Sequence, residues 1–223
     1  MANSQRHPFL KRSVVVGLYA FAMAYLESAV VVYLQHALSM TPATLFPLRD
    51  QATLGGLGSI ELGREVATLV MLVALGWLAG RTPLERLAWT SAAFGIWDIG
   101  YYFWLWVFID WPSSLGTTDL LFLLPVPWIA PVWAPILISV ELVLFGIVIA
   151  LRIGKGGSIL LKPKDLVLLI AGGFVVILSF TFDYGRIRNG GMPSPFPWPV
   201  FLIGSALGVV GIYSPLRTSA RSG

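Results

Sequence analysis

The run Leu87–Ile109, LAWTSAAFGIWDIGYYFWLWVFI, contains a single charged residue, Asp98. As an α-helix rising 1.5 Å per residue, this run would be about 34 Å long, close to the roughly 30 Å hydrocarbon core of a bilayer. A helix satisfies its own backbone hydrogen bonds, which lipid cannot do for it. The run therefore predicts a transmembrane helix with one polar group near its middle.

The composition of the whole chain agrees with that prediction. Of its 223 residues, 57% are hydrophobic and 12% are charged, whereas soluble domains carry about 25% charged residues. Because about 20 apolar residues make one span, the chain has room for about six spans and no separate soluble domain. We therefore expect an all-α polytopic membrane protein forming one membrane domain over residues 1–223.

Six apolar runs can be read along the chain. The first continues to Leu38, too far for the apolar region of a signal peptide, so an uncleaved span is expected there. The predicted spans are 13–38, 58–80, 87–109, 128–151, 165–184 and 196–214.

The basic residues predict the orientation of these spans. With six spans, 11 of the 15 lysines and arginines fall on the side of the two chain ends. These 11 are Arg6, Lys11, Arg12, Arg81, Arg86, Arg152, Lys155, Lys162, Lys164, Arg217 and Arg221. The other side keeps Arg49, Arg64, Arg186 and Arg188. Basic residues concentrate in cytoplasmic loops, so both termini are expected in the cytoplasm, with the protein in a bacterial inner membrane.

The connection before the fourth span has an unusual composition. Residues 117–124, TTDLLFLL, are apolar but too short to span a bilayer, and Thr118 or Asp119 could cap a helical turn. A short interfacial or re-entrant helix is therefore expected near 117–124. Four prolines, at positions 125, 127, 131 and 135, follow. They should prevent a regular helix until about residue 132.

The residues that suggest a function are ionisable groups inside the predicted spans. They are Glu27, Glu61, Glu65, Asp98 and Glu141, together with Arg64. Each isolated charge at membrane depth costs at least about 2.5 kcal/mol, so these side chains should face the interior of the bundle. Arg64 follows Glu61 by three residues and can act as its fixed countercharge. By the same spacing rule, Tyr101 and Tyr102 share a face with Asp98 and could donate hydrogen bonds to it.

We interpret the five acids as a buried carboxylate site, open toward the outer side, that binds cations or relays protons. A divalent metal ion is the cofactor that such oxygen ligands would hold; Glu65, Asp98 and Glu141 are the candidate ligands, with His36 as an additional nitrogen. The chain has no cysteine, which excludes iron–sulfur clusters held by thiolates. It has two histidines, one in the N-terminal tail, which argues against bis-histidine haem.

Other functions remain open at this point. The acids could instead be scattered and serve as polar contacts between helices, in a non-catalytic subunit of a larger membrane complex. Paired acids could also act on a lipid-like substrate, so the sequence leaves open whether the protein is an enzyme. The expected partners are the lipid bilayer and a second copy or other membrane subunits, and no nucleic acid.

Overall fold

The computed structural model describes residues 2–39, 46 and 57–221, and within them six helices are long and apolar enough to cross a membrane. These helices are α1 (Ala2–Ala37), α3 (Leu57–Ala79), α4 (Pro83–Ile109), α5 (Trp133–Gly154), α6 (Pro163–Thr181) and α8 (Trp198–Arg221). The prediction of six apolar helices in a multi-pass membrane protein is confirmed.

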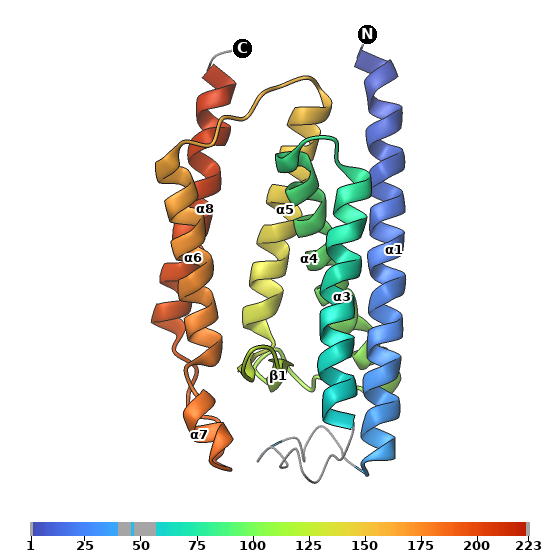
Figure 1. The fold of residues 1–223 in the computed structure, drawn as a ribbon, viewed down its shortest axis with the longest axis vertical. Coiled ribbons are helices and arrows are strands. Elements are labelled where there is room, and N and C mark those ends of the chain that lie inside the picture. The colour runs from blue at the N-terminus through green and yellow to red at the C-terminus, as the bar shows by residue number, and fades with distance from the viewer. Residues whose placement is uncertain (1, 40–45, 47–56, 222–223) are drawn as a thin grey trace.

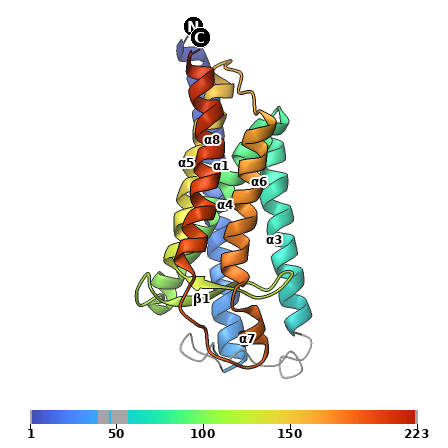
Figure 2. The same ribbon diagram turned by 90° about the vertical axis from the view of Figure 1, so that its left-hand side faces the viewer.

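The helices form two groups that lie side by side (Figure 1). In the first group, α4 packs against α1, α3 and α5. In the second, α6 and α8 pack mainly against each other. Both chain ends lie at the same end of the bundle (Figures 1 and 2). The short helix α7 (Tyr184–Arg188) lies at the opposite end, with the loops that precede α5.

Within each group, glycines allow the helices to approach closely. A Cβ added to Gly95 of α4 would lie 2.3 Å from the carbonyl oxygen of Ser139 in α5. A Cβ added to Gly172 of α6 would lie 2.8 Å from the carbonyl oxygen of Gly204 in α8. Such small-residue contacts hold transmembrane helices together because lipid provides no hydrophobic drive between them.

Residues 117–124 correct one prediction. They contain strand β1 (Thr118–Phe122), which pairs antiparallel with β2 (Trp128–Pro131), so the helix predicted here is wrong. A helix of two turns would leave about half of its backbone groups unpaired. The strand instead finds a partner immediately after the proline-containing turn. Because β2 occupies 128–131, α5 begins at Trp133 rather than at the predicted residue 128, as the prolines require.

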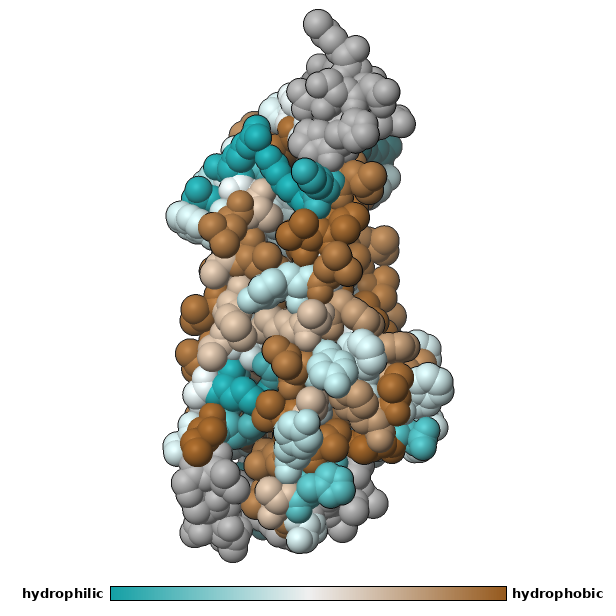
Figure 3. Space-filling model, turned by 90° about the vertical axis from the view of Figure 1, so that its right-hand side faces the viewer, coloured by the Kyte–Doolittle hydropathy of each residue, from teal (hydrophilic) through white to brown (hydrophobic). Residues whose placement is uncertain are grey.

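The outer surface of α1 and α3 is largely hydrophobic (Figure 3). Large apolar side chains such as Leu18 and Leu78 are exposed along it, which suits contact with lipid tails. Hydrophilic residues gather near the end that carries the termini. A smaller hydrophilic patch interrupts the hydrophobic surface toward the other end. The candidate acids of α3 belong to this second half of the bundle.

Candidate functional site

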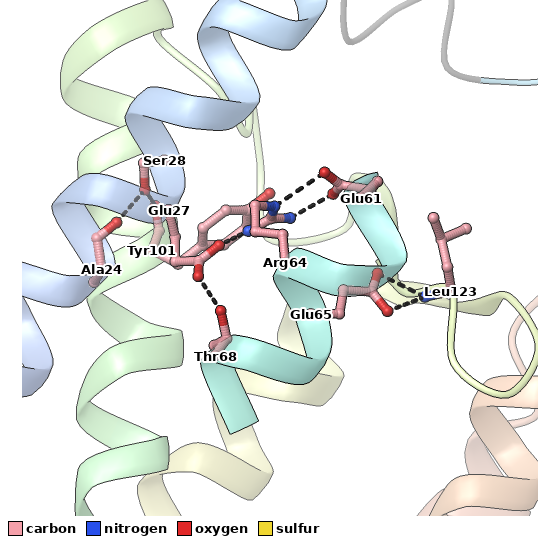
Figure 4. Close-up of polar contacts among 9 residues, drawn as sticks. All are labelled: Ala24, Glu27, Ser28, Glu61, Arg64, Glu65, Thr68, Tyr101 and Leu123. Carbon is pink, nitrogen blue, oxygen red and sulfur yellow. Dashed lines mark hydrogen bonds and ion pairs between the residues drawn. The ribbon is translucent and has the colours of Figure 1, made fainter. Parts of the chain in front are cut away.

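Arg64 of α3 lies between two of the predicted acids (Figure 4). Its Nη2 is 2.5 Å from Glu61 Oε1 and its Nε is 3.0 Å from Glu61 Oε2. It also forms an ion pair with Glu27 of α1, which in turn accepts a hydrogen bond from Thr68. Arg64 thus has the geometry of the predicted countercharge, and the Glu27–Arg64–Glu61 triad ties α1 to α3.

Glu65 lies one turn after Glu61 but serves a different partner. Its side chain points toward the β-hairpin (Figure 4), where both carboxyl oxygens accept from the backbone N–H of Leu123, at 2.9 and 3.0 Å. Leu123 directly follows β1. Glu65 therefore anchors the turn of the hairpin to α3.

Asp98 of α4 is 8% exposed and faces α5. Its Oδ2 accepts from the hydroxyl of Ser139, at 2.8 Å. The hydroxyl of Tyr102, one turn later, donates to Asp119 of β1 at 2.9 Å. The donor to Asp98 is thus a serine of the next helix, and Tyr102 serves an acid that lies outside the predicted set.

Asp119 is the acid that the sequence-based reasoning missed as a site residue. It is 5% exposed, and none of the ion pairs among the described residues involves it. The pKa of Asp119 is raised from 3.8 to about 7, mainly because burial disfavours the charged form. The Tyr102 hydroxyl and the Leu120 N–H lower the pKa, and the nearby Asp98 carboxylate raises it, within that net value. One signal marked it in advance: Asp119 is the single charged residue between Asp110 and Glu141.

Tyr101 of α4 lies close both to the Glu27–Arg64–Glu61 triad and to the two aspartates. Its ring is beside Arg64 (Figure 4), and it is close enough to Arg64, Asp98 and Asp119 to interact with each electrostatically. Its backbone carbonyl accepts from the buried hydroxyl of Ser28 in α1, at 3.0 Å. The triad and the Asp98–Asp119 pair therefore both have members close to Tyr101 of α4.

Glu141 of α5 is half-buried and accepts from the hydroxyl of Ser205 in α8, at 2.6 Å. This contact joins the two groups of helices, apart from the triad and the hairpin. His36, in the last turn of α1, is exposed. Over residues 2–39, 46 and 57–221, no three His, Cys, Asp or Glu side chains gather as a metal site would require. The divalent ion held by Glu65, Asp98 and Glu141 stays a prediction.

Comparisons with protein families, with curated proteins and with solved structures find no match to this chain. Its class is therefore defined by the fold and by the buried polar groups. The six apolar helices define an integral, multi-pass membrane protein. The five predicted acids and Asp119 fall into a charge-paired triad with Arg64, a hairpin anchor, a pair of acids with hydroxyl donors, and a contact between α5 and α8.

Proposed function

We propose that the protein binds and passes protons at the buried carboxyl pair of Asp98 and Asp119. The observation that carries the proposal is that both acids are buried and hydrogen-bonded to hydroxyl groups, with no ion pair to a basic side chain among the described residues. Two neighbouring carboxylates cannot both stay ionised in a low-dielectric interior. A shared proton relieves that repulsion, and the two groups then titrate as a coupled pair.

The partners of the pair suit proton movement. The hydroxyls of Ser139 and Tyr102 each donate to one carboxylate, and each can also accept a hydrogen bond. Arg64, the countercharge predicted from the sequence, is already engaged by Glu27 and Glu61. A proton that enters the pair is therefore next to hydroxyl groups that can transfer it, and not next to a fixed positive charge that would repel it.

The proton hypothesis is tested in proteoliposomes. A pH-sensitive dye inside the vesicles reports proton flux driven by a pH gradient, and infrared difference spectra report protonated carboxyls. Asp98→Asn and Asp119→Asn should each abolish flux and change the carboxyl band. Asp165→Asn is the matched control. Asp165 is also buried, but it accepts a hydrogen bond from the Lys162 backbone N–H at the N-terminal end of α6. Wild-type flux in both variants would contradict the proposal.

The same carboxylates could hold a divalent cation in place of the proton, as expected from their oxygen ligands. Elemental analysis of the purified protein distinguishes the two. A stoichiometric metal in the wild type that is lost in Asp98→Asn would favour the cation. Metal-free protein with a titrating carboxyl band would favour the proton.

We further propose that both termini face the cytoplasm of a bacterial cell, so that the hairpin end faces outward. The support is that 11 of 15 basic residues belong to the terminal side. The chain has no cysteine, so single cysteines can be placed without a background. Ser114 and Ser158 are exposed serines on opposite ends. In intact cells, an impermeant maleimide should label Ser114→Cys and spare Ser158→Cys; the reverse pattern would invert the topology.

A further inference from the structure

The β-hairpin connects the two groups of helices. Phe122 of β1 packs against the core of the first group, with its ring 6.2 Å from that of Trp97 in α4. Ala130 of β2 shares a core with Phe180 of α6 and Phe201 of α8. Trp128, at the start of β2, places its ring 5.9 Å from that of Phe180. Phe122 thus ties β1 to the first group, while Leu121 of β1 and Trp128 and Ala130 of β2 pack with the cluster of the second group.

The anchors of the two strands differ in chemistry. β2 is held by apolar and aromatic contacts, which do not depend on protonation. β1 has polar anchors near both ends, the Tyr102 hydroxyl on Asp119 and the Leu123 N–H on Glu65. An isolated two-stranded hairpin is marginally stable in water. The placement of β1 against α4 and α3 therefore depends on contacts of carboxyl groups as well as on the packing of Phe122.

From this arrangement we infer that the hairpin is a proton-controlled gate, closed when Asp119 is protonated and released from α4 when Asp119 ionises. The inference rests on the proposed function, because it makes proton binding at the Asp98–Asp119 pair control the hairpin. When β1 leaves α4, β2 remains with α6 and α8. The hairpin end of the bundle then opens between the two groups of helices.

The direction of the switch follows from burial and from the surrounding charges. From α4, the groups near Asp119 are Asp98, Tyr101 and Tyr102. From α3, Glu65 holds the other end of β1, and Arg64 is engaged with Glu61 and with Glu27 of α1. Within the described residues, β2, α5 and α6 present Asp119 with no ion pair. An ionised Asp119 therefore gains more from water than from its buried position.

Linkage sets the pH window. In the closed state the pKa of Asp119 is about 7, and in the released state it returns toward 3.8. Between these values the closed state holds a proton that the released state gives up. Raising the pH therefore favours release, by up to about tenfold per pH unit, and the effect levels off above about pH 7.

Hydrogen exchange in detergent or nanodiscs tests the gate. The readout is the protection factor of the amides of residues 117–124, each rate being divided by the intrinsic rate at that pH. In the wild type, protection should fall by up to about a hundredfold between pH 5 and pH 7. Amides of α6 serve as the internal reference and should not change. Equal protection at both pH values would overturn the gate.

Three variants sharpen the test. Asp119→Asn should keep the hairpin protected at every pH. Tyr102→Phe removes a donor that lowers the pKa of Asp119, so in this variant the protection of residues 117–124 should go on falling above pH 7. This variant also tests the gate if Asp119→Asn does not fold. Asp165→Asn, the matched control, removes a buried carboxyl that accepts from the backbone N–H of Lys162 and should behave as the wild type. A pH response kept in Asp119→Asn would contradict the inference.

The gate and the proposed function fail in different ways. A carboxyl infrared band that titrates while hairpin protection stays constant would reject the gate and leave proton binding intact. A carboxyl band that does not titrate, with constant protection, would reject both.

Discussion

The triad of Glu27, Arg64 and Glu61 and the pair of Asp98 and Asp119 both have members close to Tyr101. The triad contains a guanidinium between its two acids. The pair has the hydroxyls of Ser139 and Tyr102. A fixed positive charge keeps acids ionised and locks helices together, whereas a hydroxyl leaves the proton free to come and go. We therefore expect the same residue type to hold helices together in the triad and, under the proposed function, to bind and release protons in the pair.

The largest effect should come from breaking the triad. Arg64→Leu leaves Glu27 and Glu61 without a countercharge in a largely buried position, and losing one partner of a buried ion pair costs about 3–5 kcal/mol. Unfolding in mixed detergent measures the change. Arg186→Leu is the control, since that arginine is 61% exposed at its side chain and should change little. Similar small losses in both variants would show that the triad does not hold α1 to α3.

The next effect is the pH dependence of stability at the pair. The folded protein keeps a proton on Asp119 between pH about 4 and about 7, because burial raises the pKa of that carboxyl. The unfolded chain releases it over the same range. Stability should therefore decrease as the pH rises through this window, by at most about 1.4 kcal/mol per pH unit. Asp119→Asn should flatten this part of the profile in thermal unfolding; an unchanged slope would place the titrating group elsewhere.

The smallest losses of stability are expected when one hydroxyl donor is removed from each region. Ser139→Ala removes the donor to Asp98, and Thr68→Val removes the donor to Glu27. A hydrogen bond to a carboxylate contributes about 1.5–3 kcal/mol. Ser139→Ala should approach that range, while Thr68→Val should lose less because Arg64 still holds Glu27. Chemical unfolding of the two variants measures the difference, and a larger loss in Thr68→Val would reverse the contrast between the regions.

Much of this arrangement could be predicted because membrane physics acts locally. Long apolar runs must form helices in lipid, and an even number of spans returns both ends to one side. The spacing of Glu61 and Arg64 was enough to predict their contact on a single helix. The cost of buried charge also singles out Glu27, Glu65, Asp98 and Glu141 from the sequence alone.

The remaining contacts depend on the orientation of each helix about its own axis and on the loops that pack against it. Glu65 shares a helix with Glu61, yet it binds a backbone N–H in the hairpin. The strands of that hairpin pair across a turn rich in proline, and the local pattern of β1 resembles a short apolar helix. Asp119 was missed for the same reason, because its burial arises from packing of the hairpin against α4.

The sequence by itself determined that this chain forms six membrane helices, that its basic residues gather at the terminal end, and that several acids must avoid lipid. These properties follow from the free energy of placing apolar and charged groups in a bilayer, residue by residue. Only the tertiary structure decided which acid meets Arg64, which meets a hydroxyl, and which holds the hairpin. Those partners come from other helices and loops, and their positions depend on helix rotation, close packing at glycine and strand pairing between distant residues.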